Sequence, residues 1–219
     1  MNYLSRLFVC FLLLSCVSSC GKDDGDEPSG GKAPESVEAI DLGLSVKWAS
    51  CNVGAQEEWE FGGIYAWGET EEKDDYSQET YKYYDSKTGK YINIGNDIKG
   101  TKYDVAHVKW GGKWRMPNKE EMKELIDNCR KLKQTINGVK GIEIVGPNGN
   151  KIFLPYAPHK YGTGLSGKGE SLRLWCSNIG MSDHYATYAY SGNPSTSPYI
   201  SIDNDTDRED GFSVRAVCP

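Results

Sequence analysis

The clearest periodic segment of the sequence is a run of apolar side chains that begins after residue 118. Asn118 is a favourable N-cap, and Glu121 three residues later completes the pattern of a capping box. Apolar residues then recur at helical spacing, at Met122, Leu125, Ile126, Cys129 and Leu132. This spacing predicts an amphipathic helix that runs through all five and turns Cys129 toward the core. A shorter helix is expected over 104–110, where a glycine pair ends it.

Most of the chain after residue 38 is divided into short segments in which apolar and polar residues alternate, as they do in half-buried strands. We expect strands at 45–51, 64–67, 141–145, 151–154, 173–177, 186–190, 198–202 and 212–218. Asn148 and Gly149 separate two of them and are typical of a hairpin turn. The polar, tyrosine-rich stretch 69–100 lacks apolar periodicity, so we expect a mobile loop or a loose hairpin there. One or two helices with many short strands predict an α+β fold.

The N-terminus has the pattern of an export signal. Arg6 precedes an apolar stretch, 7–14, that is too short to span a bilayer. Small residues directly before Cys20 resemble a lipobox, in which a peptidase cuts before a cysteine that carries lipid. We therefore predict a lipoprotein signal peptide over 1–19, a lipidated Cys20 with a flexible acidic tether over 20–37, and one domain over 38–219. A lysine followed by acidic residues after Cys20 predicts a lipid-anchored position on the outer face of the outer membrane.

The charge balance restricts the partners that the chain can bind. It has 25 Lys and Arg against 31 Asp and Glu, a formal net charge of −6, without clusters of basic residues. Binding to nucleic acid requires a basic face that neutralises phosphates, so this partner is excluded. A mean hydropathy of −0.59 likewise excludes a membrane protein with several spans.

The domain keeps four cysteines, at Cys51, Cys129, Cys176 and Cys218. In an exported chain these favour disulfides, and four cysteines permit three connectivities. Zinc binding is disfavoured because the cysteines are far apart in sequence, without a C-x-x-C element or a nearby histidine.

Five separated blocks of sequence occur together in a characteristic order, at 41–55, 65–70, 110–117, 146–155 and 211–217. Together they resemble the major paralogous domain family known as FISUMP, over roughly residues 40–217. That family is similar to the C-type-lectin-like and formylglycine-generating-enzyme folds. The resemblance implies a twisted mixed sheet with its N- and C-terminal strands close together, one or two packed helices, and a long loop region that carries any ligand site.

The resemblance also implies a disulfide pairing. Family members carry cysteines at the positions of Cys51 and Cys129, but not at those of Cys176 and Cys218. The implied bridges are therefore Cys51 with Cys129 and Cys176 with Cys218, each of which would add about 2–4 kcal/mol of stability.

An enzyme is the least favoured interpretation. The sulfatase-activating relatives use a cysteine pair, for which Cys176 and Cys218 are the only candidates, and their 42-residue separation fits a structural bridge better. No G-x-S-x-G element accompanies the scattered histidines, and the glycine-rich run 162–169 lacks the ending of a phosphate-binding loop. We therefore expect a non-catalytic domain without a cofactor.

Calcium is the one cofactor that the sequence leaves open. Asp203, Asp205 and Asp207 alternate, which would direct carboxylates to one side of an extended segment. The EF-hand glycine and distal glutamate are missing, so we favour a solvated acidic turn over a metal site.

The most suggestive surface lies in residues 177–210, which contain six Ser and four Tyr, a composition typical of antibody paratopes. The expected ligand-binding side chains are Tyr185, Tyr188, Tyr190 and Tyr199, with Tyr156 and Tyr161 nearby. We predict a cell-surface lipoprotein that binds an extracellular glycan or protein. The alternatives are a structural or assembly subunit of a surface structure and, less favoured, a sulfatase-modifying-type enzyme.

Overall fold

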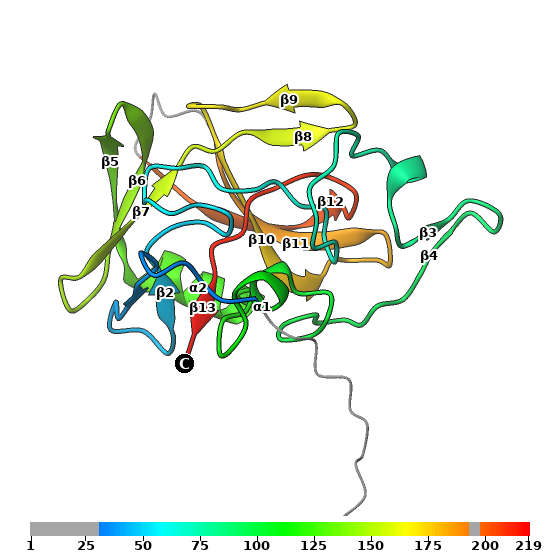
Figure 1. Cartoon of the computed structure of the whole chain (residues 1–219). Helices are drawn as coiled ribbons and strands as arrows, with labels where there is room; N and C mark the ends of the chain where they lie inside the picture. The colour runs from blue at the N-terminus through cyan, green and yellow to red at the C-terminus, as the bar shows by residue number, and fades with distance from the viewer. Residues whose placement is uncertain (1–30, 193–197) are drawn as a thin grey trace, which may run out of the picture.

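The computed structural model describes residues 31–192 and 198–219, and the predicted signal peptide and Cys20 lie outside them. The described part is built from small antiparallel sheets and two helices, which confirms a sheet-rich fold (Figure 1). At its centre is a three-stranded sheet of β10 (Leu172–Ile179), β11 (Tyr185–Ser191) and β12 (Ser201–Asp207). A second sheet contains β5 (Arg130–Ile136), β6 (Val139–Val145) and β7 (Lys151–Pro155), and includes the predicted hairpin around Asn148.

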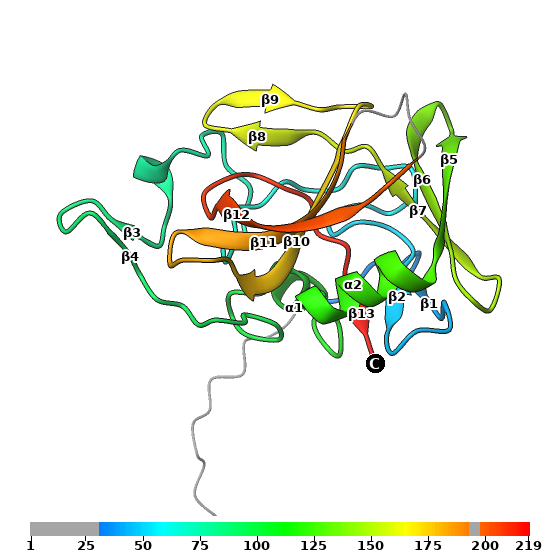
Figure 2. The same ribbon diagram turned by 180° about the vertical axis from the view of Figure 1, so that it is seen from behind.

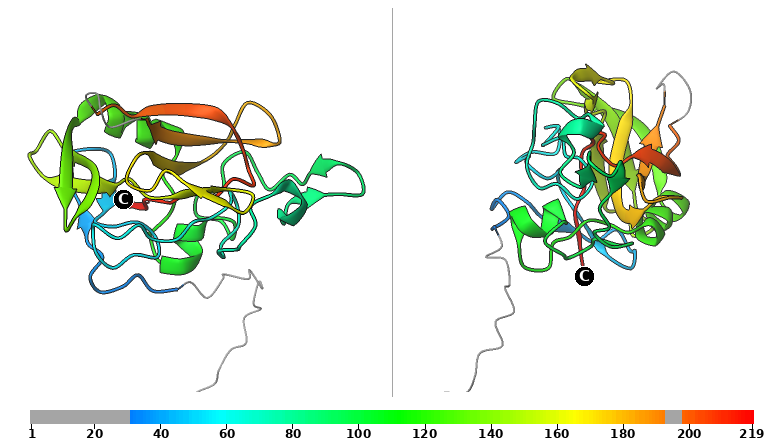
Figure 3. Two further views of the ribbon diagram at one scale, coloured as in Figure 1. Left: turned by 90° about the horizontal axis from the view of Figure 1, so that it is seen from above. Right: turned by 90° about the vertical axis from the view of Figure 1, so that its right-hand side faces the viewer.

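The remaining strands form shorter pairings. β1 (Ala39–Ile40), β2 (Lys47–Ala49) and β13 (Val217–Cys218) join the two ends of the domain in one sheet. The β3–β4 hairpin (Tyr84–Asp85 and Lys90–Tyr91) projects from one end of the molecule (Figure 3). The β8–β9 hairpin (His159–Tyr161 and Gly164–Ser166) lies on one side of the central sheet, and the helices lie on the other (Figures 1 and 2).

Both predicted helices are present. In α1 (Val105–Trp110), the Asp104 side chain caps the first turn, and in α2 (Lys119–Asn128), Asn118 and Glu121 form the predicted capping box. The predicted length of α2 was wrong, because the helix ends at Asn128 and Leu132 lies in β5. Seven residue pairs with β6 hold β5 in an extended conformation. The position of Leu132 at helical spacing is therefore a coincidence, because strand pairing determines the conformation of this segment.

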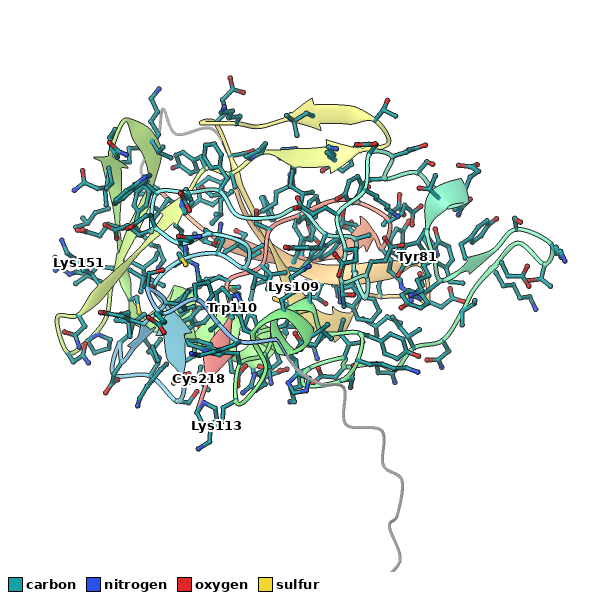
Figure 4. All side chains as sticks on the ribbon, in the orientation of Figure 1. Tyr81, Lys109, Trp110, Lys113, Lys151 and Cys218 are labelled. Atoms are coloured by element: carbon teal, nitrogen blue, oxygen red, sulfur yellow. The ribbon has the colours of Figure 1, made fainter. Side chains whose placement is uncertain are left out.

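The stretch 69–100 contains the short β3–β4 hairpin and one 3₁₀ turn, η1 (Gln78–Thr80), but it is not a loose loop. Tyr76, Tyr81, Ile94 and Ile98 are all buried. Its apolar side chains reach the core from irregular backbone, which leaves no period of two or 3.6 residues for sequence analysis to detect. Tyr81 lies near the base of the hairpin, at the opposite end of the molecule from Lys151 (Figure 4).

Several buried contacts of the core involve the sequence blocks 41–55, 65–70 and 211–217. Trp67 Nε1 donates to the carbonyl of Cys176 at 3.0 Å, and Trp175 Nε1 donates to that of Tyr65 at 2.7 Å. The Arg215 guanidinium is fully buried and donates to Asn52 Oδ1 and to three backbone carbonyls at 2.8–2.9 Å. Burial lowers the pKa of Arg215 to about 10. Arg215 thereby joins the blocks 41–55, 146–155 and 211–217 inside the core.

The four cysteines are buried free thiols, so neither implied disulfide is formed in the structure. Cys51 belongs to one core cluster, beside Val53 and Trp110, whereas Cys129 and Cys176 belong to a second cluster around α2. Cys218 lies in β13, across from Lys47 of β2.

Candidate ligand-binding groove

A polar cavity of about 560 Å³ lies between the β3–β4 hairpin and the adjoining ends of β11 and β12. We call it the hairpin groove. Its lining residues are Gln78, Gly89, Lys90, Tyr91, Asp183, His184, Asp207 and Glu209.

The buried side chain of Arg208 holds the walls of the hairpin groove together. Arg208 Nε donates to Tyr81 Oη at 3.0 Å, and Nη1 donates to the backbone oxygen of Asp183 at 2.8 Å and to that of Ile92 at 3.3 Å. The guanidinium also lies 5.6 Å from the centre of the Tyr91 ring, as in a cation–π contact. One side chain thereby joins the hairpin, the β10–β11 turn and the end of β12.

The base of the groove is a chain of three hydrogen-bonded side chains. Gln78 Nε2 donates to Tyr91 Oη at 2.8 Å, and Tyr91 Oη donates to the Glu209 carboxylate at 2.9–3.0 Å. Burial raises the pKa of Glu209, and the neighbouring Asp207 carboxylate adds to the rise. The orientation of Tyr91 is therefore fixed from both sides by polar partners.

One wall of the groove is the His184 ring. It stacks on Tyr91 with ring centroids 5.7 Å apart and an interplanar angle of 29°. Its Nδ1 lies 3.1 Å from Ser182 Oγ, and the Asp183 carboxylate lies 3.8 Å away. The imidazole is partly exposed, so it presents a flat ring at the cavity in a defined orientation.

These groups suit a ligand rich in hydroxyl groups. The carboxylates of Asp183, Asp207 and Glu209 accept hydrogen bonds, whereas the side chains of Gln78 and Lys90 donate them. The Tyr91 and His184 rings supply apolar surface beside these polar groups. Flat rings surrounded by fixed donors and acceptors are what a sugar requires, because it carries apolar C–H faces and many hydroxyls.

The structure divides the six predicted tyrosines among different environments. Tyr185 adjoins His184 at the groove, with ring centroids 3.8 Å apart. Tyr156 and Tyr188 are buried, so neither ring is available to a ligand in the way that we expected. The remaining three are at least partly exposed but do not line the hairpin groove: Tyr161, Tyr190 and Tyr199.

The predicted acidic turn was wrong, because Asp203, Asp205 and Asp207 lie in strand β12. Hydrogen bonding to β11 keeps the segment extended, with a register shift between the pairs Ala186–Thr206 and Tyr188–Asp203. Partial desolvation and the neighbouring Asp203 carboxylate raise the pKa of Asp205. Within residues 31–192 and 198–219, no three His, Cys, Asp or Glu side chains are grouped to hold a metal ion.

The cysteine pair considered for an enzyme is inaccessible. Cys176 is completely buried, and burial raises the pKa of both the Cys176 and the Cys218 thiols. A raised pKa disfavours the thiolate, which is the nucleophilic form.

The residues that line the groove come from two stretches of sequence. Four of them lie within 69–100, the stretch predicted to be mobile: Gln78, Gly89, Lys90 and Tyr91. The other four lie within 177–210, where a ligand surface was expected, although the tyrosines and not these residues were named as its contacts, apart from Asp207 as a calcium candidate: Asp183, His184, Asp207 and Glu209. The density of tyrosines in 76–91 was the available signal, because closely spaced aromatic residues indicate a packed segment.

Comparison with known proteins gives no relative: no family model matches the sequence, and no curated protein or solved structure matches it significantly. The described residues contain no helix that is both long enough and apolar enough to cross a membrane.

Proposed function

We propose that the protein is a surface lipoprotein of the FISUMP type, with a C-type-lectin-like domain that binds an extracellular glycan without catalysis. The observation that carries the glycan assignment is the hairpin groove. Its stacked Tyr91 and His184 rings are surrounded by three carboxylates and two donor side chains. The position of this groove agrees with the expectation that loops, rather than the core, carry the ligand site.

Sequence and structure support the other parts of the proposal separately. The lipobox ending at Cys20 supports a lipid anchor in the outer membrane. The pairing of β2 with β13 supports the C-type-lectin-like assignment, because the N- and C-terminal strands are adjacent in such folds. Arg115, in the sequence block 110–117, makes a bidentate ion pair with Glu121 at 2.6–2.8 Å, which joins that block to α2 and agrees with the packed helix that the resemblance implies.

A structural or assembly role remains the second candidate, because the β8–β9 hairpin exposes apolar side chains. Tyr161 is 43% exposed and Leu165 is 56% exposed, on a hairpin that lies at the surface of the domain (Figure 1). An apolar hairpin of this kind can pack against another subunit. Sedimentation velocity over a range of concentrations tests this candidate: polymers that disappear in Leu165→Ser would favour assembly over glycan binding.

A glycan array tests the proposed function directly. The wild-type protein should bind a defined set of glycans, and His184→Ala should weaken that binding at least tenfold because a wall of the groove is removed. Tyr199→Ala is the matched control, since Tyr199 is exposed but does not line the groove. Parallel arrays with calcium and with chelator test the calcium prediction for Asp203, Asp205 and Asp207. A folded protein that binds no glycan would contradict the proposal.

A further inference from the structure

The charges that line the hairpin groove do not balance. Among the lining residues that the structure describes, three carry carboxylates and Lys90 is the only lysine or arginine. The three are Asp183, Asp207 and Glu209. Hydroxyl groups of a sugar can be bound by uncharged amide and hydroxyl oxygens, so a neutral sugar does not require this excess of negative charge. The imbalance therefore indicates a further property of the ligand.

Glu209 is the most informative of the three, because its carboxylate is nearly buried and has no cationic partner. The residue is 7% exposed. Its Oε1 and Oε2 atoms lie 3.0 and 2.9 Å from Tyr91 Oη, whose single proton can satisfy one of them. Within residues 31–192 and 198–219, no Lys, Arg or His nitrogen lies within 4.0 Å of this carboxylate. Buried carboxylates are normally paired, so Glu209 lacks a counter-ion.

Neither Arg208 nor Lys90 supplies this counter-ion. Arg208 is next to Glu209 in the chain, but its guanidinium donates to Tyr81 Oη and to two backbone oxygens. Lys90 lines the groove, but it makes no ion pair in the described part of the chain. The positive charge that Glu209 lacks can therefore come from a ligand.

The carboxylates are accessible from the cavity. Glu209 lines the groove, Asp207 is exposed at the end of β12, and the side chain of Asp183 is 73% exposed. The Tyr91 and His184 rings line the same space, at the end of the molecule from which the β3–β4 hairpin projects (Figure 3). A ligand in the cavity therefore contacts the rings and the carboxylates without a rearrangement of the chain.

The carboxylates at this end of the molecule also repel one another. Burial raises the pKa of Glu209, and the Asp207 carboxylate adds to the rise. Burial likewise raises the pKa of the neighbouring Asp210 to about 7, and the charges of Asp207 and Glu209 contribute. A positive charge in the groove would offset this repulsion, whereas a further negative charge would increase it.

We propose that the hairpin groove binds a sugar that carries a free amino group. The ammonium of the sugar contacts the carboxylates of Glu209 and Asp207, and its ring lies against Tyr91 and His184. This inference rests on the proposed glycan-binding function and names a chemical subclass of its ligand. An ammonium has three donors, no acceptor and a positive charge, which match acceptors that lack a counter-ion. The neighbouring carboxylates also favour the protonated form of the amine.

The groove disfavours two other classes of charged ligand. In the part of the chain that the structure describes, no three His, Cys, Asp or Glu side chains are grouped to hold a metal ion. An ammonium requires no such cage of ligands, so it fits better than a divalent metal. A sugar with a carboxylate or a sulfate would be repelled by the lining carboxylates and by the net charge of −6 of the chain. An amino sugar is therefore the charged sugar that the groove favours.

The test uses the purified full chain and three 1,4-linked disaccharides that share one pyranose skeleton and differ at C2. Cellobiose carries hydroxyls there, the disaccharide of N-acetylglucosamine carries acetamides, and the disaccharide of glucosamine carries free amines. In isothermal titration calorimetry at neutral pH, the amine form should bind about tenfold more tightly than the other two, and high salt should reduce this preference. Equal affinities would overturn the amino-sugar inference and leave glycan binding intact. Absence of binding by the amine form would overturn the inference too, and a blank glycan array would overturn the proposed function as well.

Three variants and a peptide complete the test. Glu209→Gln keeps an acceptor for Tyr91 Oη and should reduce the preference for the amine form to less than about twofold. Glu120→Gln, at an exposed position in α2, makes the same change in net charge and should leave the preference unchanged. Should Glu209→Gln fail to fold, Asp207→Asn should reduce the preference, and in the wild-type protein the ¹³C resonance of Glu209 Cδ should move with the amine form alone. An unchanged preference in Glu209→Gln, an unmoved Glu209 resonance, or tighter binding of a tripeptide with a central lysine would overturn the proposal.

Discussion

Replacing Arg208 with lysine should strongly destabilise the domain, because a single ammonium cannot replace the three nitrogen donors of the guanidinium. Arg208 is fully buried and donates to Tyr81 Oη, Asp183 O and Ile92 O. Lysine can satisfy one or two of these acceptors. Each lost hydrogen bond to a charged group costs about 1.5–3 kcal/mol. With partial relaxation, we expect Arg208→Lys to lower the free energy of unfolding by about 3 kcal/mol.

Urea unfolding followed by tryptophan fluorescence measures this change, and Trp67 is a direct reporter because the guanidinium lies 4.9 Å from its ring centre. With an m-value of about 2 kcal/mol/M, the midpoint should fall by roughly 1.5 M at unchanged m. Arg130→Lys, at an exposed position in β5, is the control and should change stability by less than about 0.5 kcal/mol. A midpoint shift below about 0.5 M in Arg208→Lys would refute the role assigned to Arg208.

Three further predictions address the core, the pH dependence and the thiols. Asp104→Ala should cost about 3–5 kcal/mol in urea unfolding, because four backbone N–H groups donate to this buried carboxylate at 2.8–3.1 Å; a loss below about 1 kcal/mol would contradict this. Burial raises the pKa of Asp210 to about 7, so the folded state loses stability as pH rises from about 4 through 7. Asp210→Asn should thus be more stable than wild type at pH 8, on the order of 2 kcal/mol, with a smaller gain at pH 5, whereas the exposed control Asp74→Asn should show no such difference. The unfolded, unreduced protein is alkylated and its peptides are analysed by mass spectrometry. All four thiols of the domain should be labelled: Cys51, Cys129, Cys176 and Cys218. Two bridges that protect these thiols from alkylation would instead support the disulfide pairing implied by the family resemblance.

The sequence was sufficient to predict elements that are stabilised by residues close together in the chain. The capping box at Asn118 is formed as predicted, with Glu121 N donating to Asn118 Oδ1 at 2.8 Å. The hairpin around Asn148-Gly149 is formed too, and Gly149 has the positive φ of 88° that makes glycine favourable in such a turn. Both depend on residues within a few positions of one another, which sequence patterns register well.

Elements that depend on distant partners could not be predicted. The segment after Asn128 becomes a strand because β6 pairs with it, and β12 is extended because β11 pairs with it. Burial of Tyr76 and Tyr81 depends on a region around Arg208 that lies more than 120 residues away in the chain. These buried tyrosines lie on irregular backbone, so the apolar residues show no regular spacing in the sequence from which the contacts could be predicted.

The hairpin side of the groove could not be predicted for the same reason. Tyr91 and Glu209 share a hydrogen bond but are 118 positions apart, and each alone has the appearance of a solvated surface residue. The predicted tyrosine surface includes buried residues because composition cannot distinguish Tyr188, which is packed against Trp175 and Phe212, from Tyr199, which is exposed.

The central claim, that the hairpin groove binds a hydroxyl-rich ligand, is tested most directly by amide chemical-shift mapping. The ¹⁵N-labelled protein is titrated with the oligosaccharide that gives the strongest signal on the glycan array. The largest shifts should occur at Lys90, Tyr91, His184 and Asp207, and His184→Ala should abolish them. Absence of shifts at these residues, or saturable shifts centred on Tyr199 instead, would contradict the central claim.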